Sequence, residues 1–261
     1  MPLKLYHSTT SVCAMKVRLA LEEKALAWDS ELLSLQRGDQ HDPAYLKLNP
    51  NGVVPTLVDE GRVVIESTLI IEYLDEAFPQ APLMPAEPYR RALARLFMKR
   101  IDDYLHAATS TVTFAAAFRA HFLKLPPEEP RARLARIPDP AYRERQRLSI
   151  EQGLDAPQVS PALRQFDRYF GDMEEALASG PYLAGDSYTL ADAAATPYVN
   201  RAAMLGMEAL WRRRPRLRAW LERVAQRPNF ARAVTKWFTD EDRERFTVDR
   251  DAVNRALKGV T

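Results

Sequence analysis

A short stretch in the first quarter of the chain decides the fold: Asn49-Pro50-Asn51-Gly52 followed by Val53-Val54-Pro55-Thr56-Leu57. The first four residues are strong turn formers, and the apolar residues after them have the composition of a strand. Proline has no N–H group to donate and is tolerated where a strand begins, so Pro55 marks that beginning. The sequence therefore predicts a turn that leads into a strand at 55–58.

Strand and helix patterns alternate on both sides of this strand. Before it, the sequence predicts a strand at 3–6, an amphipathic helix at 12–24, a strand at 27–33 and a short helix at 43–48. After it, a Gly-containing connection leads to a strand at 63–65, and Ser67 caps a helix that ends near Phe78. The order β-α-β-α-β-β-α predicts an α/β domain with a mixed four-stranded sheet and helices on its faces.

The remainder of the chain has no strand patterns. Four prolines within 78–88 predict a linker, so we assign 1–79 to the α/β domain, 80–88 to a linker and 89–261 to an all-α domain. Helices are predicted at 90–122, 161–178, 190–205 and 215–226. The Pro- and Arg-rich segment 125–161 predicts a helix-poor excursion, or a short helix at 141–152 between loops. The charged end from Thr239 is expected at the periphery, and Trp237-Phe238 before it is expected to be buried.

Composition excludes several classes of function. The 37 basic and 35 acidic residues leave a net charge of +2, which gives no sign of a nucleic-acid or anionic-membrane partner. The single cysteine excludes an internal disulfide framework and any multi-thiolate metal site, and the four histidines lack metal-binding spacing. No apolar run approaches the roughly 20 residues of a membrane span. We therefore expect a cytoplasmic protein without a metal.

Three separated motifs resemble the glutathione-binding domain of the glutathione transferases. They are the segment from Ser11 to Leu21, the stretch at 49–57, and the pair Glu66-Ser67. The predicted helical domain is similar to that family's second domain, and the resemblance extends from Leu3 to about Phe230. It implies a thioredoxin-like first domain, glutathione as co-substrate, a hydrophobic electrophilic small molecule as second substrate, and a homodimer.

Ser11 lies where serine-type members of this family keep their catalytic hydroxyl. A free thiol has a pKa of about 8.5, and lowering that by two units needs a preference of roughly 2.7 kcal/mol for the thiolate. A hydroxyl donor and a helix N-terminus can supply it. From the residues alone, Ser11 is equally well a helix cap. Cys13 is the competing candidate, because some bacterial members place a catalytic cysteine there, although a free cysteine often only packs.

The resemblance also implies the groups that bind glutathione. The Val54-Pro55 bond matches the family's cis peptide, which turns the Val54 backbone toward the cysteinyl part of glutathione. Ser67 opens a helix and is expected to bind the γ-glutamyl carboxylate, with Glu66 at the γ-glutamyl amino group. His41 matches a position that presents a cation to the glycyl carboxylate. Without the resemblance, Ser67 is an ordinary helix cap and His41 a surface histidine.

A further signature, Thr189-x-x-Asp192, has the form of a capping box with an acidic third position. It resembles the folding motif of the family's helical domain. We expect it to contribute to stability and not to chemistry.

The substrate side is expected to include aromatic residues and a histidine of the helical domain. The candidate pocket residues are Tyr104, His106, Phe114, Phe118 and Trp237, although an aromatic stripe at helical spacing is more often core. The run 64–74 and the excursion at 125–158 are similar to bacterial members that cleave aryl ethers of lignin with glutathione. The turn Ser-Thr-Thr-Ser-Val-Cys at 8–13 departs from the Gly-rich turn of those enzymes.

The leading hypothesis is therefore a glutathione transferase whose Ser11 stabilises the glutathione thiolate for attack on an electrophilic, apolar molecule, an aryl ether among the candidates. One alternative is a non-catalytic glutathione-binding or regulatory protein of the same fold. The other is a thiol-disulfide transferase that uses Cys13.

Overall fold

The structure is a computed structural model that describes residues 3–260. Its backbone contacts divide into two compact units, each made of separate stretches of the chain. Unit 1 contains the residues up to Met98, then Tyr182–Pro197 and Arg223–Thr239. Unit 2 contains Lys99–Pro181, Tyr198–Glu222 and the residues from Asp240 onward. The two units are defined by backbone contacts and not by the type of fold, so they do not test the predicted domain boundaries. The boundaries at 79 and 89 therefore stay a prediction.

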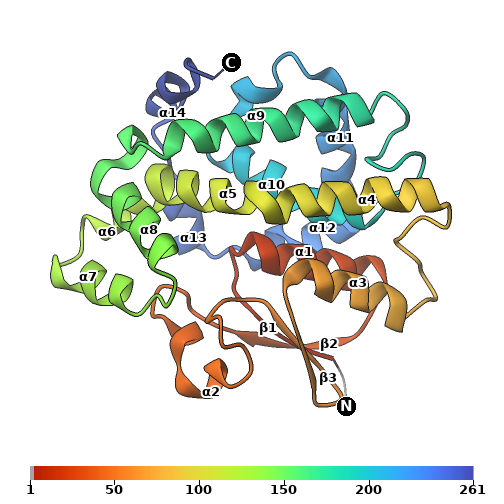
Figure 1. Ribbon diagram of the computed structural model, residues 1–261, viewed down its shortest axis with the longest axis horizontal. Helices are drawn as coiled ribbons and strands as arrows, with labels where there is room; N and C mark the ends of the chain where they lie inside the picture. The colour runs from red at the N-terminus through yellow and green to blue at the C-terminus, as the bar shows by residue number, and fades with distance from the viewer. Residues whose placement is uncertain (1–2, 261) are drawn as a thin grey trace. The chain divides into compact units, whose positions relative to one another are not determined.

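Unit 1 is built on the predicted four-stranded mixed sheet, with strand order β2-β1-β3-β4. Strand β1 pairs in parallel with β2 and antiparallel with β3, which in turn pairs antiparallel with β4. Helices α1 and α3 lie together over one face of this sheet (Figure 1). The elements are β1 Leu3–His7, α1 Val12–Glu23, β2 Trp28–Leu32, α2 Pro43–Leu46, β3 Thr56–Asp59, β4 Arg62–Ile65 and α3 Ser67–Ala77.

Helix α1 differs from the amphipathic helix that the sequence predicts. Every residue from Val12 to Leu21 except Cys13 is buried, and this includes Lys16 and Arg18. The apolar cluster around Met15 and Leu19 is completed by residues far along the chain within the same unit, namely Ala193, Phe230, Ala233 and Val234. Covering on several sides leaves no solvated face for the two cations, so α1 is a core helix.

The predicted helices are present with small differences at their ends. The segment at 90–122 is helical throughout as α4 Pro88–Arg100, α5 His106–Thr113 and α6 Arg119–Phe122, with π-helical turns at Ile101–Leu105 and Phe114–Phe118. The three later predictions correspond to α9 Val159–Ala176, α10 Leu190–Met204 and α11 Pro215–Ala225. The final helices are α12 Pro228–Ala233, α13 Asp240–Arg245 and α14 Arg250–Leu257.

The Pro-rich excursion contains two helices, α7 Glu128–Ala135 and α8 Pro140–Gln152. Helix α8 fulfils the short-helix alternative, whereas α7 was not predicted. Its prolines are at the start of the helix: Pro127 is the N-cap, and Pro130 lies in the first turn beside Glu128 and Glu129. Proline is compatible with a first helical turn, because the N–H groups there have no partner within the helix.

Helix α10 begins with the predicted capping motif. The Asp192 carboxylate accepts hydrogen bonds from the Thr189 backbone N–H at 2.9 Å, the Thr189 hydroxyl at 3.0 Å and the Leu183 N–H at 3.0 Å. The Thr189 hydroxyl oxygen in turn accepts the Ala191 N–H at 3.2 Å. Asp192 is completely buried, so these bonds replace all of its hydration and fix both the helix start and the loop before it.

Candidate glutathione site

The sheet register brings the three sequence motifs to one edge of unit 1. Tyr6 near the end of β1 pairs with Thr56 at the start of β3, and Thr56 pairs with Ile65 at the end of β4. The turn that leads to Ser11, the Val54-Pro55 bond and the Glu66-Ser67 pair each begin within a few residues of this row. The Ser11 turn therefore ends beside two segments that come more than 40 residues later in the sequence.

Ser11 is the N-cap of α1, as one of its two predicted roles requires. Its Oγ accepts the Ala14 N–H at 3.2 Å, and its backbone lies in the extended region. Because that bond uses a lone pair, the hydroxyl proton can still be donated to a ligand at the helix N-terminus. A cap that accepts from its own helix and donates outward can stabilise an anion such as a thiolate. The two roles of Ser11 are therefore compatible.

The loop before β3 is held rigidly from inside the unit. The Tyr45 hydroxyl contacts the Val53 carbonyl at 2.6 Å and the Thr56 Oγ1 at 2.8 Å, and the Asn49 side-chain amide donates to the same two oxygens at 2.9 and 3.2 Å. The Val54-Pro55 bond inside this loop is cis, which confirms the prediction. Val54 is thus presented by a loop that four hydrogen bonds to Val53 and Thr56 hold in place.

The start of α3 differs in detail from the sequence prediction. Ser67 is the first residue of the helix and is buried, while Glu66 occupies the N-cap position without a side-chain cap bond. Glu66 has φ of +68°, in the region that L-residues rarely adopt, and its carboxylate accepts a 3.4 Å bond from the Asn51 side chain. The prediction that Ser67 caps the helix is therefore wrong. The unusual backbone at Glu66 is the kind of local strain that is concentrated at functional sites.

His41 lies against the turn at the other side of this loop. It ends a 3₁₀ turn at Asp39–His41, and its ring is so close to Gly52 that a Cβ on that glycine would lie 2.8 Å from His41 Cδ2. Gly52 also has φ of +61°, so both the backbone conformation and the close contact with His41 require glycine at this position. His41 and the loop that carries Val54 consequently form one packed corner of unit 1.

Arg18 is the functional residue that the sequence interpretation missed. Its guanidinium is fully buried and donates to the backbone carbonyls of Ser8 and Thr9, each at 3.0 Å, which form the turn before Ser11. The same group donates to the Ala233 carbonyl at 2.7 Å. The available signal was weak: an arginine in the middle of a helix with apolar neighbours. Arg18 therefore fixes the turn that delivers Ser11 to the helix N-terminus.

His7 completes this buried network. Arg18 Nη1 lies 3.0 Å from His7 Nδ1 and can only donate, so Nδ1 accepts and His7 carries its proton on Nε2, which lies 2.8 Å from Ser30 Oγ. Burial, with a smaller contribution from the Arg18 charge, lowers the pKa of His7 to about 3. Burial also lowers the pKa of Arg18 to about 9. At neutral pH the pair is a neutral imidazole and a charged guanidinium.

Trp237 is placed by this network. Its ring lies 5.1 Å from the Arg18 guanidinium and 4.7 Å from the His7 ring, and its Nε1 donates to the Arg232 carbonyl at 2.9 Å. Trp237 and Phe238 are both half-buried, so the expectation that this pair is buried is met only in part. These contacts explain its position within unit 1, and its membership of a substrate pocket stays a prediction.

Cys13 lies on the first turn of α1, is not part of a disulfide and is partly exposed. It lies two residues beyond Ser11 in the sequence, and its role as the competing catalytic residue stays a prediction.

The other four candidate pocket residues lie in unit 2. Phe114 is buried and its ring is 5.2 Å from that of Phe118, in the apolar cluster beneath α7 and α8. Tyr104 is half-buried, and exposed His106 has its Nδ1 3.2 Å from the Tyr198 hydroxyl. Phe114 is thus a core residue, which agrees with the expectation that an aromatic stripe at helical spacing is more often core than pocket. His106 presents a polar group, and the substrate role of all four stays a prediction.

Residues 3–260 contain neither a cluster of metal ligands nor a membrane-spanning helix. Within that range no three or more His, Cys, Asp or Glu side chains cluster in a way that could hold a metal ion. None of the helices described for this chain is long and apolar enough to cross a membrane.

Comparison with known proteins identifies the family of this chain. The family model of the glutathione S-transferase N-terminal domain matches residues 5–82, and that of the C-terminal domain matches residues 120–228. The chain belongs to the glutathione S-transferase family. It therefore combines a glutathione-binding sheet domain with a helical domain, and it is an enzyme of the glutathione transferase class.

Individual relatives show which members of the family this chain is similar to. Protein LigF of Sphingobium sp. is 31% identical over 94% of this chain and 96% of its own length. The tetrachloro-p-hydroquinone reductive dehalogenase of Sphingobium chlorophenolicum is 30% identical over 89% of this chain and 96% of its own length. The crystal structure of the Sphingobium beta-etherase LigF matches with a TM-score of 0.80 and 30% identity, over 90% of this chain and all of that chain.

Proposed function

We propose that this glutathione transferase cleaves aryl ethers, with the Ser11 hydroxyl donating a hydrogen bond to the glutathione thiolate. The observation that carries the assignment of the site is the row Tyr6, Thr56 and Ile65, which gathers Ser11, Val54-Pro55 and Glu66-Ser67 at one sheet edge. The substrate class is suggested by the similarity to a beta-etherase over nearly the whole chain.

In the proposed complex the glutathione backbone lies along the start of β3. The Val54 N–H and C=O pair with the cysteinyl residue like a neighbouring strand. The γ-glutamyl carboxylate is bound at the N-terminus of α3, where Ser67 and the free helix N–H groups favour an anion, and Glu66 takes the γ-glutamyl amino group. His41 is the proposed partner of the glycyl carboxylate.

The reaction is a substitution at carbon. The thiolate sulfur attacks the carbon that carries the aryloxy group, the new C–S bond forms as the C–O bond breaks, and the electron pair leaves with the phenolate oxygen. The phenolate takes up the proton that the thiol lost, so glutathione and the ether yield a thioether and a phenol. Ser11 contributes by stabilising the thiolate, and the site by holding both reactants together.

Two expectations accompany this proposal. The enzyme acts as a homodimer, as the family resemblance implies, and it works in the cytoplasm, where glutathione is abundant and a single cysteine stays reduced. Size-exclusion chromatography with light scattering tests the first, since a monomer would elute near the chain mass of 29.7 kDa.

Release of 4-nitrophenol from a β-(4-nitrophenyl) ether tests the mechanism. Loss of one hydrogen bond to a charged sulfur is expected to lower kcat of Ser11→Ala by about 10- to 100-fold and to shift its pH profile upward, while glutathione affinity stays similar. Cys13→Ala is the matched control and should keep its activity.

Each contrary result has a defined meaning. Full activity in Ser11→Ala refutes the assignment of the hydroxyl donor. Loss of activity in Cys13→Ala alone points instead to thiol-disulfide exchange through that sulfur. Glutathione binding without cleavage of the ether, and without conjugation of any electrophile, would leave only the non-catalytic alternative.

A further inference from the structure

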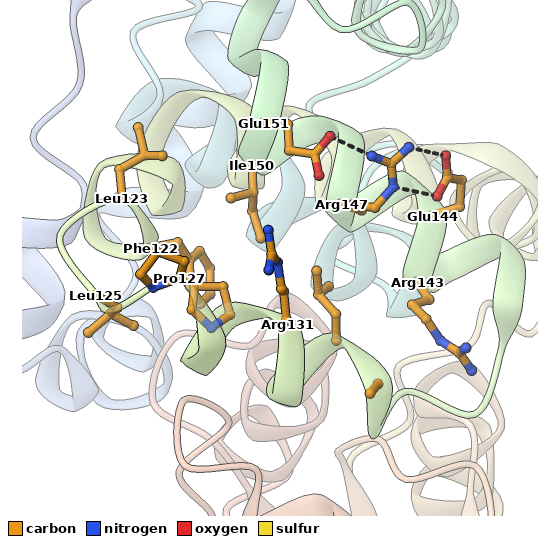
Figure 2. A pocket seen from close by; sticks show the side chains of 13 residues that line it. Phe122, Leu123, Leu125, Pro127, Arg131, Arg143, Glu144, Arg147, Ile150 and Glu151 are labelled. Atoms are coloured by element: carbon orange, nitrogen blue, oxygen red, sulfur yellow. Dashed lines mark hydrogen bonds and ion pairs between the residues drawn. The ribbon is translucent and has the colours of Figure 1, made fainter.

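Unit 2 contains a cavity of about 490 Å³ between α7 and α8, well removed in sequence from every glutathione-site residue (Figure 2). Its volume lies within the range of about 300–1,000 Å³ that is usual for small-molecule sites. Most of its wall is apolar and comes from the end of α6, the loop after it and the facing sides of α7 and α8. The apolar lining residues include Phe122, Leu123, Leu125, Leu134, Ala135 and Ile150.

The wall is preformed and not a loose loop. Helix α7 is anchored by Arg133, whose buried guanidinium lies 5.0 Å from the Phe122 ring and whose Nη1 donates to Gln146 Oε1 of α8 at 3.0 Å. The connection between the helices is held by Arg143, which donates twice to the Ile137 carbonyl, at 3.1 and 2.7 Å. These bonds keep α7 and α8 apart at a fixed spacing, so the space between them is kept open.

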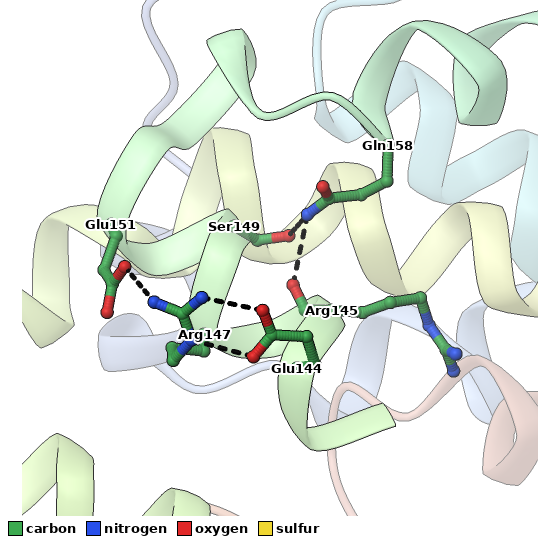
Figure 3. Close-up of polar contacts among 6 residues, drawn as sticks. All are labelled: Glu144, Arg145, Arg147, Ser149, Glu151 and Gln158. Carbon is green, nitrogen blue, oxygen red and sulfur yellow. Dashed lines mark hydrogen bonds and ion pairs between the residues drawn. The ribbon is translucent and has the colours of Figure 1, made fainter. Parts of the chain in front are cut away.

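Of the charged α8 residues that line the cavity, Arg147, Glu144 and Glu151 are paired with one another, whereas Arg143 donates to a backbone carbonyl. Arg147 donates to both oxygens of Glu144, at 2.8 and 2.7 Å, and to Glu151 at 2.5 Å (Figure 3). Next to this triad, the Gln158 side-chain amide donates to the Arg145 carbonyl and to Ser149 Oγ, each at 3.2 Å, which fixes the C-terminal half of the helix. The charge of Arg147 is therefore already engaged by two carboxylates on its own helix.

Arg131 on α7 is the exception. Its side chain extends from α7 across the cavity toward Ile150 (Figure 2), and it forms no hydrogen bond or ion pair with any residue of the described chain. The three arginines and two glutamates that line the cavity leave one net positive charge. An unpaired guanidinium fork against an apolar wall is complementary to a single carboxylate on an apolar body.

We propose that this cavity is a second ligand site, which binds small apolar or aromatic monocarboxylates through Arg131 and is independent of the glutathione chemistry. Leu123 supports the assignment, because it is 57% exposed at the cavity rim, where a bound apolar body would cover it.

Isothermal titration with 4-phenylbutyrate tests the proposal, in the presence of saturating glutathione. We expect one site per chain, and about tenfold or greater weakening for Arg131→Gln and for the neutral analogue 4-phenylbutyramide. The matched control is Arg164→Gln on α9, which removes one exposed arginine that bonds only Ser160 and leaves the cavity unchanged. Ala135→Phe, which fills the cavity from an exposed position on α7, should abolish binding without touching the charge.

Equal affinity of the wild type and Arg131→Gln overturns the proposal. So does a site that glutathione displaces, or the lack of saturable binding of 4-phenylbutyrate. Circular dichroism and thermal midpoints of the variants establish that each one is folded.

Discussion

Replacement of Arg18 by lysine should damage both stability and thiol activation. The guanidinium makes four hydrogen bonds of 2.7–3.0 Å, to Ala233 O, His7 Nδ1, Ser8 O and Thr9 O. A lysine ammonium keeps the charge, but its single nitrogen cannot reach acceptors spread around a planar fork. If it loses two of the four bonds at about 1.5–3 kcal/mol each, the free energy of unfolding falls by about 3 kcal/mol or more.

The second consequence is functional. Because the Ser8 and Thr9 carbonyls position the turn before Ser11, we expect Arg18→Lys to raise the pKa of the bound glutathione thiol and to lower kcat by about tenfold. Urea denaturation measures the stability, and the ultraviolet absorbance of the thiolate, titrated against pH, measures the pKa.

Arg227→Lys is the matched control. Arg227 also makes a two-pronged contact, with both carboxylate oxygens of Glu23 at 2.9 and 2.5 Å, but its side chain is 30% exposed and does not touch the Ser11 turn. It should lose about 1 kcal/mol of stability and keep the thiol pKa. An Arg18→Lys protein that loses less than about 1 kcal/mol, or that keeps the wild-type thiol pKa, would refute the reasoning.

Two further predictions concern stability. Asp192→Ala removes a buried carboxylate that accepts three bonds and should cost about 3 kcal/mol in urea denaturation, whereas Asp186→Ala, at an exposed site, should cost under about 1 kcal/mol; equal losses would contradict this. The pKa of His7 falls from 6.5 unfolded to about 3 folded, so the unfolded chain binds the extra proton between these values. Stability is then complete above pH 6.5 and declines below it, by about 2 kcal/mol at pH 5. His7→Gln should lack this contribution, and an identical pH dependence in both proteins would count against it.

Local patterns were sufficient to predict most of the fold. The strands and helices of the sheet domain follow from turn residues and hydrophobic periodicity, and the capping motif at Thr189-Asp192 follows from residue type and spacing alone. Helix α7 was missed because prolines that lie in a first helical turn have the same composition as prolines in a loop. Distinguishing the two requires knowing where the helix begins.

The site was predictable only in part. Ser11, Val54-Pro55 and Glu66 belong to motifs that are contiguous in the sequence, so their resemblance to a family could be recognised. Arg18 acts through a carbonyl at Ala233, and the burial that makes it important comes from residues more than 170 positions away. No window of the sequence contains both partners. The cavity at Arg131 has the same origin, since it depends on how α7 is anchored.

The bond from Arg18 to the Ala233 carbonyl has a consequence for biosynthesis. The two residues are 215 positions apart, and a ribosome that adds about 5–20 residues per second needs roughly 10 to 40 s to make the second after the first. For that interval the nascent chain carries a cation in the middle of its first helix without the carbonyl and the indole that later enclose it. Unit 1, which carries Ser11, therefore completes its packing only when almost the whole chain has been synthesised. Messages truncated before codon 239 should yield chains that chaperones and proteases recognise as unfinished.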